Sequence, residues 1–132
     1  MNADQNEKKL SARGGQHPKK ILWMSQHRPL PMQLDALRRL FGEVEVQQDP
    51  QPFDSAEDIA ERYRAGGYDD IVVVAPLSVI GKLVDLGIKP LWCQMDQVKS
   101  AEDADISFRN RHYKFNRFRR VTALRLEFEE IS

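Results

Sequence analysis

Cysteine is almost absent from this sequence of 132 residues, in which Cys93 stands alone. A single thiol forms no internal disulfide and cannot build a zinc site from several cysteines, which fits a reducing compartment. Long hydrophobic runs are also missing, since no apolar stretch approaches the roughly twenty residues that span a bilayer, and the N-terminus lacks an apolar signal core. These absences predict a cytoplasmic protein with no membrane partner.

An excess of charge of either sign is missing as well. The 20 lysine and arginine residues balance the 20 aspartate and glutamate residues, so the formal net charge is zero. No global field therefore draws the chain towards nucleic acid or a membrane. Any electrostatic preference has to come from a local cluster.

Several motifs that carry chemistry do not occur. The glycine patterns of dinucleotide sites and P-loops are absent, which disfavours an ordinary NAD or ATP enzyme. There is no Gly-x-Ser-x-Gly elbow of a serine hydrolase. The three histidines, His17, His27 and His112, lack the spacing of metal ligands. We therefore expect neither a metal nor a cofactor.

The chain has the length of one ordinary domain. Residues 1–18 contain almost no apolar side chains, which predicts a flexible N-terminal tail. From there on, short apolar runs alternate with amphipathic stretches. Residues 19–132 are therefore expected to form a single Rossmann-like α/β domain.

This alternation has the order β-α-β-α-β-α-β. Strands are expected at residues 21–24, 43–46, 71–75 and 91–95, and helices at residues 32–41, 56–65 and 79–86. The unbroken β-branched run at 71–75 is typical of a central strand covered on both faces. The order predicts an α/β fold with a doubly wound, mainly parallel sheet and helices on both faces.

The last segment shows a different pattern. Leu124, Leu126 and Phe128 alternate with charged residues, as in a strand with one buried face. We expect this strand to pair with residues 108–118 as a C-terminal antiparallel β-hairpin at the edge of the sheet.

Ligands of open α/β sheets bind beyond the carboxyl ends of the strands, and the loop after the first strand holds Ser25, Gln26, His27 and Arg28. It leads directly into a helix, whose unpaired N–H groups suit a phosphate or carboxylate. The expected cap position holds Leu30, which cannot cap, so these N–H groups are left for water or a ligand. The alternative is that His27 and Arg28 are solvated loop residues.

Other strand ends offer less specific candidates. Ser78 could donate to a phosphate, or simply cap the third helix. Gln94 and Asp96 could touch a ribose or base, although solvent exposure at a strand end explains them equally well. Cys93, between apolar neighbours, is interpreted as a buried and inert thiol.

One local cluster is strongly basic. Aromatic residues separate its positive charges, as surfaces that track phosphates and stack bases require. Its basic residues are Arg109, Arg111, Lys114, Arg117, Arg119 and Arg120. The competing interpretation is an edge hairpin that uses charge to prevent sheet-to-sheet association.

The run ILWMSQHRPLPMQLDALRRLFG, residues 21–42, resembles the opening of small CRISPR-associated Rossmann-fold (CARF-like) proteins, some of which are ring nucleases of type III CRISPR antiviral defence. The resemblance covers about residues 20–48 and implies a homodimer that binds cyclic oligoadenylate across its two-fold axis and linearises it without metal. It places residues 25–28 at the phosphates and Ser78 in a second contacting loop.

Three functional hypotheses follow. In the first, the protein is a nucleotide-binding, metal-independent ring nuclease in which His27 is the acid or base and Arg28 stabilises charge; binding without turnover is left open. In the second, residues 109–120 form a non-catalytic nucleic-acid- or protein-binding module. In the third, the chain is an interaction protein with no small ligand.

Overall fold

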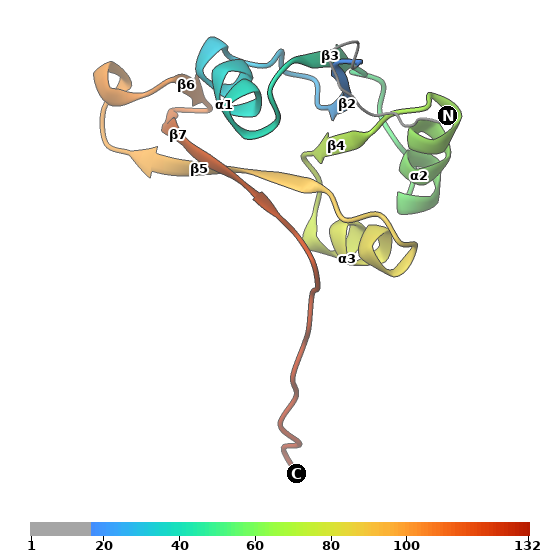
Figure 1. The fold of residues 1–132 in the computed structure, drawn as a ribbon. Helices are drawn as coiled ribbons and strands as arrows, with labels where there is room; N and C mark the ends of the chain where they lie inside the picture. Colours follow the sequence, from blue (N-terminus) through green and yellow to red (C-terminus); the bar gives the residue numbers. More distant parts are fainter. Residues whose placement is uncertain (1–16) are drawn as a thin grey trace.

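The computed structural model describes residues 17–132, so all but the last two residues of the predicted tail lie outside the described part. This part of the chain has an α/β fold with three α-helices and a six-stranded sheet (Figure 1). The strands are β2 (Lys19–Met24), β3 (Val44–Gln48), β4 (Asp70–Val73), β5 (Leu91–Val98), β6 (Ile106–Phe108) and β7 (Arg111–Arg120). The helices are α1 (Pro31–Phe41), α2 (Ala56–Ala65) and α3 (Leu77–Asp85), with a short 3₁₀ turn, η1 (Ala101–Asp103).

The strands lie in the order β3-β2-β4-β5-β7-β6. The first four are parallel to one another, whereas β7 runs antiparallel to both β5 and β6. Strand β4 lies inside the sheet, as its β-branched sequence predicts. The chain passes from β2 to β3 on one side and then to β4 on the other, so the direction of strand order reverses at β2.

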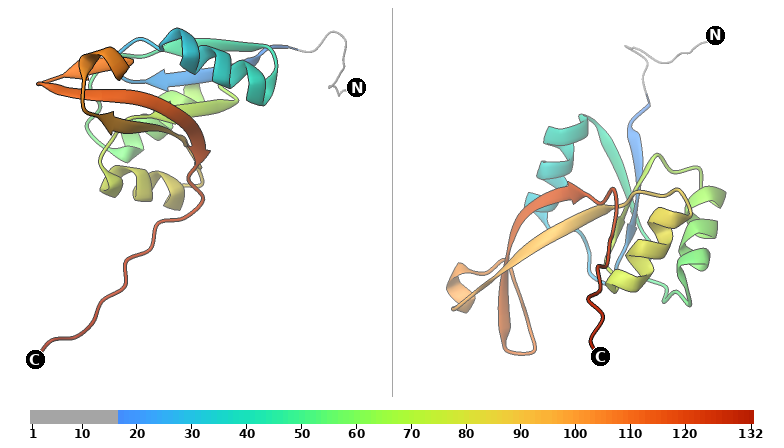
Figure 2. Two further views of the ribbon diagram at one scale, coloured as in Figure 1. Left: turned by 90° about the vertical axis from the view of Figure 1, so that its left-hand side faces the viewer. Right: turned by 90° about the horizontal axis from the view of Figure 1, so that it is seen from below.

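The sheet is mixed and curled, and it differs from the doubly wound parallel sheet that the sequence pattern predicts. Strands β4 and β5 are joined by one register pair, Val72 with Leu91, while β5 pairs with β7 along its whole length. The β5–β7 ribbon, irregular after Gln94, leans away from the parallel strands (Figure 2). This separation leaves Val74, directly after β4, exposed.

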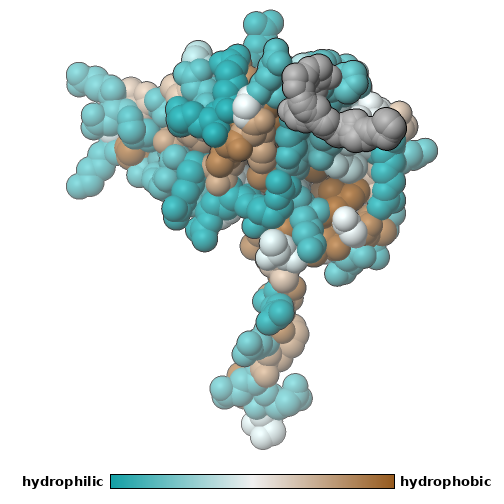
Figure 3. All heavy atoms as spheres, in the orientation of Figure 1, coloured by the Kyte–Doolittle hydropathy of each residue, from teal (hydrophilic) through white to brown (hydrophobic). Residues whose placement is uncertain are grey.

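The predicted C-terminal hairpin is wrong. Residues 108–118 do not pair with residues 124–128; instead β7 turns back on β6 through Arg109 and Asn110, which have φ values of 53° and 64°. Positive φ at both positions is the geometry of a tight two-residue hairpin turn, and asparagine tolerates it. Because β5 and β6 already flank β7, residues 121–132, which we call the arm, have no secondary structure and extend from the domain (Figures 1 and 3).

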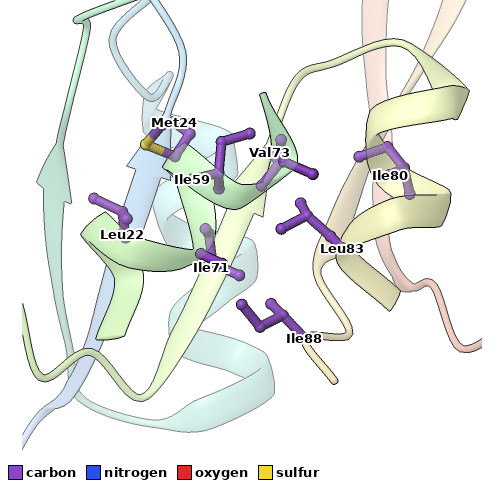
Figure 4. Close-up of a cluster of buried hydrophobic side chains, with 10 residues drawn as sticks. Leu22, Met24, Ile59, Ile71, Val73, Ile80, Leu83 and Ile88 are labelled. Atoms are coloured by element: carbon purple, nitrogen blue, oxygen red, sulfur yellow. The ribbon is translucent and has the colours of Figure 1, made fainter. Parts of the chain in front are cut away.

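Two apolar clusters lie on opposite faces of the sheet, α1 covering one face and α2 with α3 the other (Figure 2). Alternate residues of β2 divide between them, since Ile21 and Trp23 pack towards α1, and Leu22 and Met24 towards α2 and α3. Figure 4 shows the second cluster, where Leu83 of α3 meets residues of the strands and α2. This two-sided burial explains the continuous apolar runs of β2 and β4. None of the helices in the described part is long and apolar enough to cross a membrane.

Helix α2 begins as its sequence predicts, with the Oγ atom of Ser55 accepting a hydrogen bond of 3.1 Å from the backbone N–H of Asp58. We expect Ser55→Ala to lower the free energy of unfolding by about 1 kcal/mol, because that N–H loses its partner. Urea unfolding followed by circular dichroism measures the change. Ser55→Asp, which keeps an acceptor at the cap, should stay near the wild type, and an equal loss in both variants would contradict a capping role.

Candidate ligand-binding site

The loop between β2 and α1 lies at the carboxyl edge of the sheet, where the strand order reverses. Neighbouring strands hold its backbone. The indole Nε1 of Trp23 donates to the carbonyl of His27 at 2.9 Å, the N–H of His27 donates to Ser25 Oγ at 3.1 Å, and Gln48 Nε2 donates to the carbonyl of Ser25 at 3.0 Å. The side chains of Gln26, His27 and Arg28 are exposed. A fixed backbone therefore presents three free polar side chains.

Helix α1 starts without a side-chain cap, as the sequence predicts. Leu30 occupies the cap position, Pro31 follows it, and the first turn contains no acidic residue. The side chain of Gln33 reaches back from the first turn, and its Oε1 accepts the N–H of Leu30 at 2.7 Å. The positive end of the helix dipole thus lies beside Arg28, with no carboxylate of the first turn to offset it.

Two cavities flank the loop. One, of about 280 Å³, is lined mainly by apolar and aromatic side chains, and we call it the aromatic cavity. The other, of about 370 Å³, lies between the loop and residues 49–53 and is more polar. Ser25, His27 and Val74 line both. The aromatic cavity also includes Trp23, Gln33, Cys93, Met95, Phe108 and Tyr113.

Gln33 is the least expected residue of the aromatic cavity, since its side chain comes from α1 and it is only 5% exposed. Its amide nitrogen lies 3.2 Å from Cys93 Sγ and 3.8 Å from Met95 Sδ. Sulfur is a weak acceptor, so a buried amide donor has no strong partner here. A ligand with an acceptor atom in the cavity would satisfy it.

Cys93 does not supply a nucleophile. Burial raises the pKa of its thiol to about 11, and the hydrogen bond from Gln33 offsets this only in part. The thiol therefore stays protonated at neutral pH, and it lies 3.7 Å from the thioether of Met95. A protonated thiol reacts poorly as a nucleophile, in agreement with the inert Cys93 that the sequence indicates.

Strands β6 and β7 also line the aromatic cavity, through Ile106, Phe108 and Tyr113. The ring of Phe108 meets the ring of His27 edge-on at 6.0 Å between centroids, and the guanidinium of Arg109 lies 5.0 Å from the centre of Phe108. Sequence reasoning did not place Phe108 in the site. The available signal was the polar pair at residues 109 and 110, which marks a tight turn and so brings Phe108 back over the sheet.

The other predicted site residues lie elsewhere. Ser78 is exposed in the first turn of α3, where Pro76 takes the cap position, and lines neither cavity. Gln94 accepts a 3.5 Å hydrogen bond from Arg117 Nε, and Asp96 accepts one of 2.8 Å from Asn116 Nδ2. Strand alternation explains why they stand apart: their neighbours on β5, Cys93 and Met95, are the residues that line the cavity.

The basic segment forms a strand whose charges and aromatic rings are segregated. Phe118 is buried, and Tyr113 and Phe115 are half-buried. Arg120 is engaged with the buried carboxylate of Asp70. The other predicted basic residues are exposed and consist of Arg109, Arg111, Lys114, Arg117 and Arg119. The rings of residues 113, 115 and 118 therefore do not stand exposed between these charges.

Within residues 17–132, no three histidine, cysteine, aspartate or glutamate side chains gather where they could hold a metal ion. No protein-family model matches the sequence, and no curated protein or solved structure is significantly similar to the chain. Any functional proposal therefore has to be supported by the residues of the site.

Proposed function

We propose that the loop after β2 and the aromatic cavity together bind a phosphate-bearing nucleotide, of which cyclic oligoadenylate is the form to test first. One observation carries the proposal: a buried amide donor, Gln33, has no strong acceptor inside an aromatic cavity whose rim holds His27 and Arg28 at an uncapped helix start. The four parallel strands with a reversal at β2 support a Rossmann-like interpretation, in which ligands lie at this edge.

The cavity suits the base of such a ligand. A flat heterocycle gains both apolar burial and ring contacts from Trp23, Phe108 and Tyr113. The amide N–H groups of Gln33, which contact only sulfur atoms among the described residues, select a ring nitrogen or carbonyl acceptor on the base edge, because its Oε1 already accepts from Leu30. A purine nitrogen meets this requirement.

The loop suits the phosphate. The guanidinium of Arg28 and the start of α1 both favour a negative charge, and no acidic side chain lies in the first helical turn. Base and phosphate contacts then lie side by side, since Ser25 and His27 line both cavities. The CARF-like resemblance of the same loop supports a cyclic oligoadenylate shared by two cytoplasmic subunits.

The same groups suffice for a metal-independent cleavage, which we include in the proposal. The ribose 2′-oxygen forms a bond to the adjacent phosphorus, and the bond from phosphorus to the 5′-oxygen breaks. The proton of the 2′-hydroxyl passes through His27 to the departing 5′-oxygen, leaving a 2′,3′-cyclic phosphate and a 5′-hydroxyl. Arg28 stabilises the extra negative charge on the phosphate in the transition state.

We expect calorimetric titration to detect binding of cyclic oligoadenylate to the wild type, with Arg28→Ala weakening it at least tenfold because a charge-assisted hydrogen bond is lost. Arg38→Ala is the matched control, since Arg38 is exposed on the far part of α1 and its ion-pair partner within residues 17–132 is Asp35. His27→Ala should abolish the linear product, detected chromatographically, while the ligand still binds.

Three outcomes would contradict the proposal. In the first, the wild type binds no cyclic oligoadenylate, linear oligoadenylate or mononucleotide. In the second, Arg28→Ala and Arg38→Ala bind the ligand equally well. In the third, binding survives Arg28→Ala but is lost in Arg117→Ala/Arg119→Ala, which would assign the binding to the basic segment. Binding of linear oligoadenylate or a mononucleotide alone, lost in Arg28→Ala, supports the site and rejects the cyclic ligand.

A further inference from the structure

The arm, residues 121–132, exposes large apolar side chains along an extended backbone. Leu126 is 85% exposed, Phe128 84% and Ile131 90%. The brown side chains along it are visible in Figure 3, well away from the body of the domain. Leu124, Leu126 and Phe128 share one face by strand alternation. Such a row of exposed apolar groups indicates a surface that meets another molecule.

An apolar groove begins where the arm leaves the domain. It has a volume of about 430 Å³ and lies between α3, the end of β4 and the β5–β7 ribbon. Its exposed apolar side chains include Val74, Leu77 and Trp92 of the domain body. Leu124, at the base of the arm, already contacts α3 over Gly81, since its Cδ1 would lie 3.3 Å from a Cβ at that position. The arm thus fills only one end of the groove.

We propose that the groove is filled by the arm of a second copy of this chain, in a two-fold dimer that exchanges arms. The chain carries both an apolar segment, the arm, and an apolar groove that the arm of the same chain fills at one end only. A two-fold axis satisfies both at once, because each arm then lies on the partner's groove and the assembly closes. No third component is required.

Charge favours the same occupant. The outer part of the arm is acidic, with Glu127, Glu129 and Glu130. Lys114, Arg117 and Arg119 are exposed on β7, and Arg119 lines the groove. These groups attract one another over a Debye length of about 8–10 Å. An arm from a copy of this chain therefore brings negative charge to a positive flank.

The backbone geometry allows the exchange. Residues 121–132 form no strand, and apart from the Val121 N–H, which donates to the carbonyl of Pro90, their backbone N–H and C=O groups can pair with an identical segment. Two-fold symmetry makes the two arms antiparallel, and an axis near Leu126 sets the partner subunit's Phe128 opposite Leu124. That position is the mouth of the groove, where Leu124 meets α3. Strand addition and groove filling thus occur in one arrangement.

Sedimentation velocity and light scattering on the full chain test this proposal. The wild type is expected to dimerise at micromolar concentrations, and Leu126→Asp/Phe128→Asp to weaken the dimer about a hundredfold, as removal of central apolar contacts does. Arg125→Asp is the matched control: it changes the net charge equally but lies on the opposite face of the arm. Leu77→Asp, in the groove, should reproduce the loss.

Circular dichroism confirms that each variant is folded, which is expected because the changed side chains are exposed. A wild type that stays monomeric throughout the micromolar range overturns the proposal. So does a dimer that survives both the arm and the groove substitutions, since its interface then lies elsewhere. The contact of Arg28 with a nucleotide is tested separately, by the titration with Arg28→Ala, and its failure would leave an arm-exchanged dimer standing.

Discussion

Replacing Leu83 by alanine is expected to lower the free energy of unfolding by about 3 kcal/mol. Leu83 is fully buried on α3, in the cluster that also holds Ile59, Ile71 and Ile88. The substitution removes apolar contacts with both the sheet and the neighbouring helix, and it leaves a cavity that the rigid strands on one side cannot fill. The loss in free energy of unfolding should therefore be much larger than that caused by a substitution at an exposed residue.

Urea unfolding monitored by fluorescence and circular dichroism measures this loss. Leu40→Ala is the matched control, because Leu40 is 56% exposed on α1, and it should change the free energy of unfolding by less than about 0.5 kcal/mol. Equal effects of the two substitutions would mean that α3 does not pack against the sheet as described. An unchanged m-value would show that the unfolding still exposes the same surface.

The second large effect concerns the ion pair of Asp70, which is 4% exposed at the start of β4. Arg120 donates to both carboxylate oxygens at 2.7 and 2.8 Å, and Lys19 lies at 3.4 Å. We expect Arg120→Met to lower the free energy of unfolding by about 2 kcal/mol, because it leaves a buried carboxylate short of its main partner. This expected loss is smaller than that for breaking a fully buried ion pair, since the side chain of Arg120 is 37% exposed.

The pH dependence of the free energy of unfolding tests whether the charge of Asp70 causes the loss of stability in Arg120→Met. Burial alone raises the pKa of Asp70, but hydrogen bonds from Arg120 and the Ile71 N–H, with the charges of Arg120 and Lys19, lower it below 3.8. In the wild type, ionised Asp70 therefore stabilises the folded state at pH values above the pKa that it has in the unfolded chain. This stabilisation is lost as the pH falls through the lower pKa of Asp70 in the folded state. In Arg120→Met the pKa of Asp70 in the folded state rises. The difference in free energy of unfolding between the wild type and Arg120→Met should therefore narrow as the pH is lowered towards 3.

Arg111→Met is the control for this measurement, because Arg111 is exposed at the other end of β7 and forms no ion pair among the described residues. It should leave the stability and its pH profile near those of the wild type. A stability gap between Arg120→Met and the wild type that stays constant down to acid pH would show that lost packing, and not the charge of Asp70, causes the effect.

Local patterns account for most of the elements. The apolar runs at β2 and β4 mark strands covered on both faces, and Ser55 marks the start of α2. The cap position of α1 was also read correctly, since Leu30 forms no side-chain cap. These features depend on residues close together in the chain, so periodicity and cap chemistry are sufficient to find them.

The candidate site was only partly predictable. The loop at residues 25–28 was placed correctly at the carboxyl edge, because it follows a strand whose end can be read from the sequence. Gln33 and Phe108 were missed. Gln33 looks like an ordinary helix residue, and Phe108 reaches the loop through the turn at residues 109 and 110. The sequence alone therefore does not show that either residue lines the cavity.

The amino-acid sequence by itself determined the α/β class, the order of the first seven elements and the position of the polar loop, because these follow from local periodicity and turn chemistry. Only the tertiary structure decided that β7 pairs with β5 and β6, that the sheet curls, and that residues 121–132 extend from the domain. The physical reason is that strand pairing is non-local: an alternating segment such as residues 122–128 shows that it has an apolar face, but not which surface will cover it.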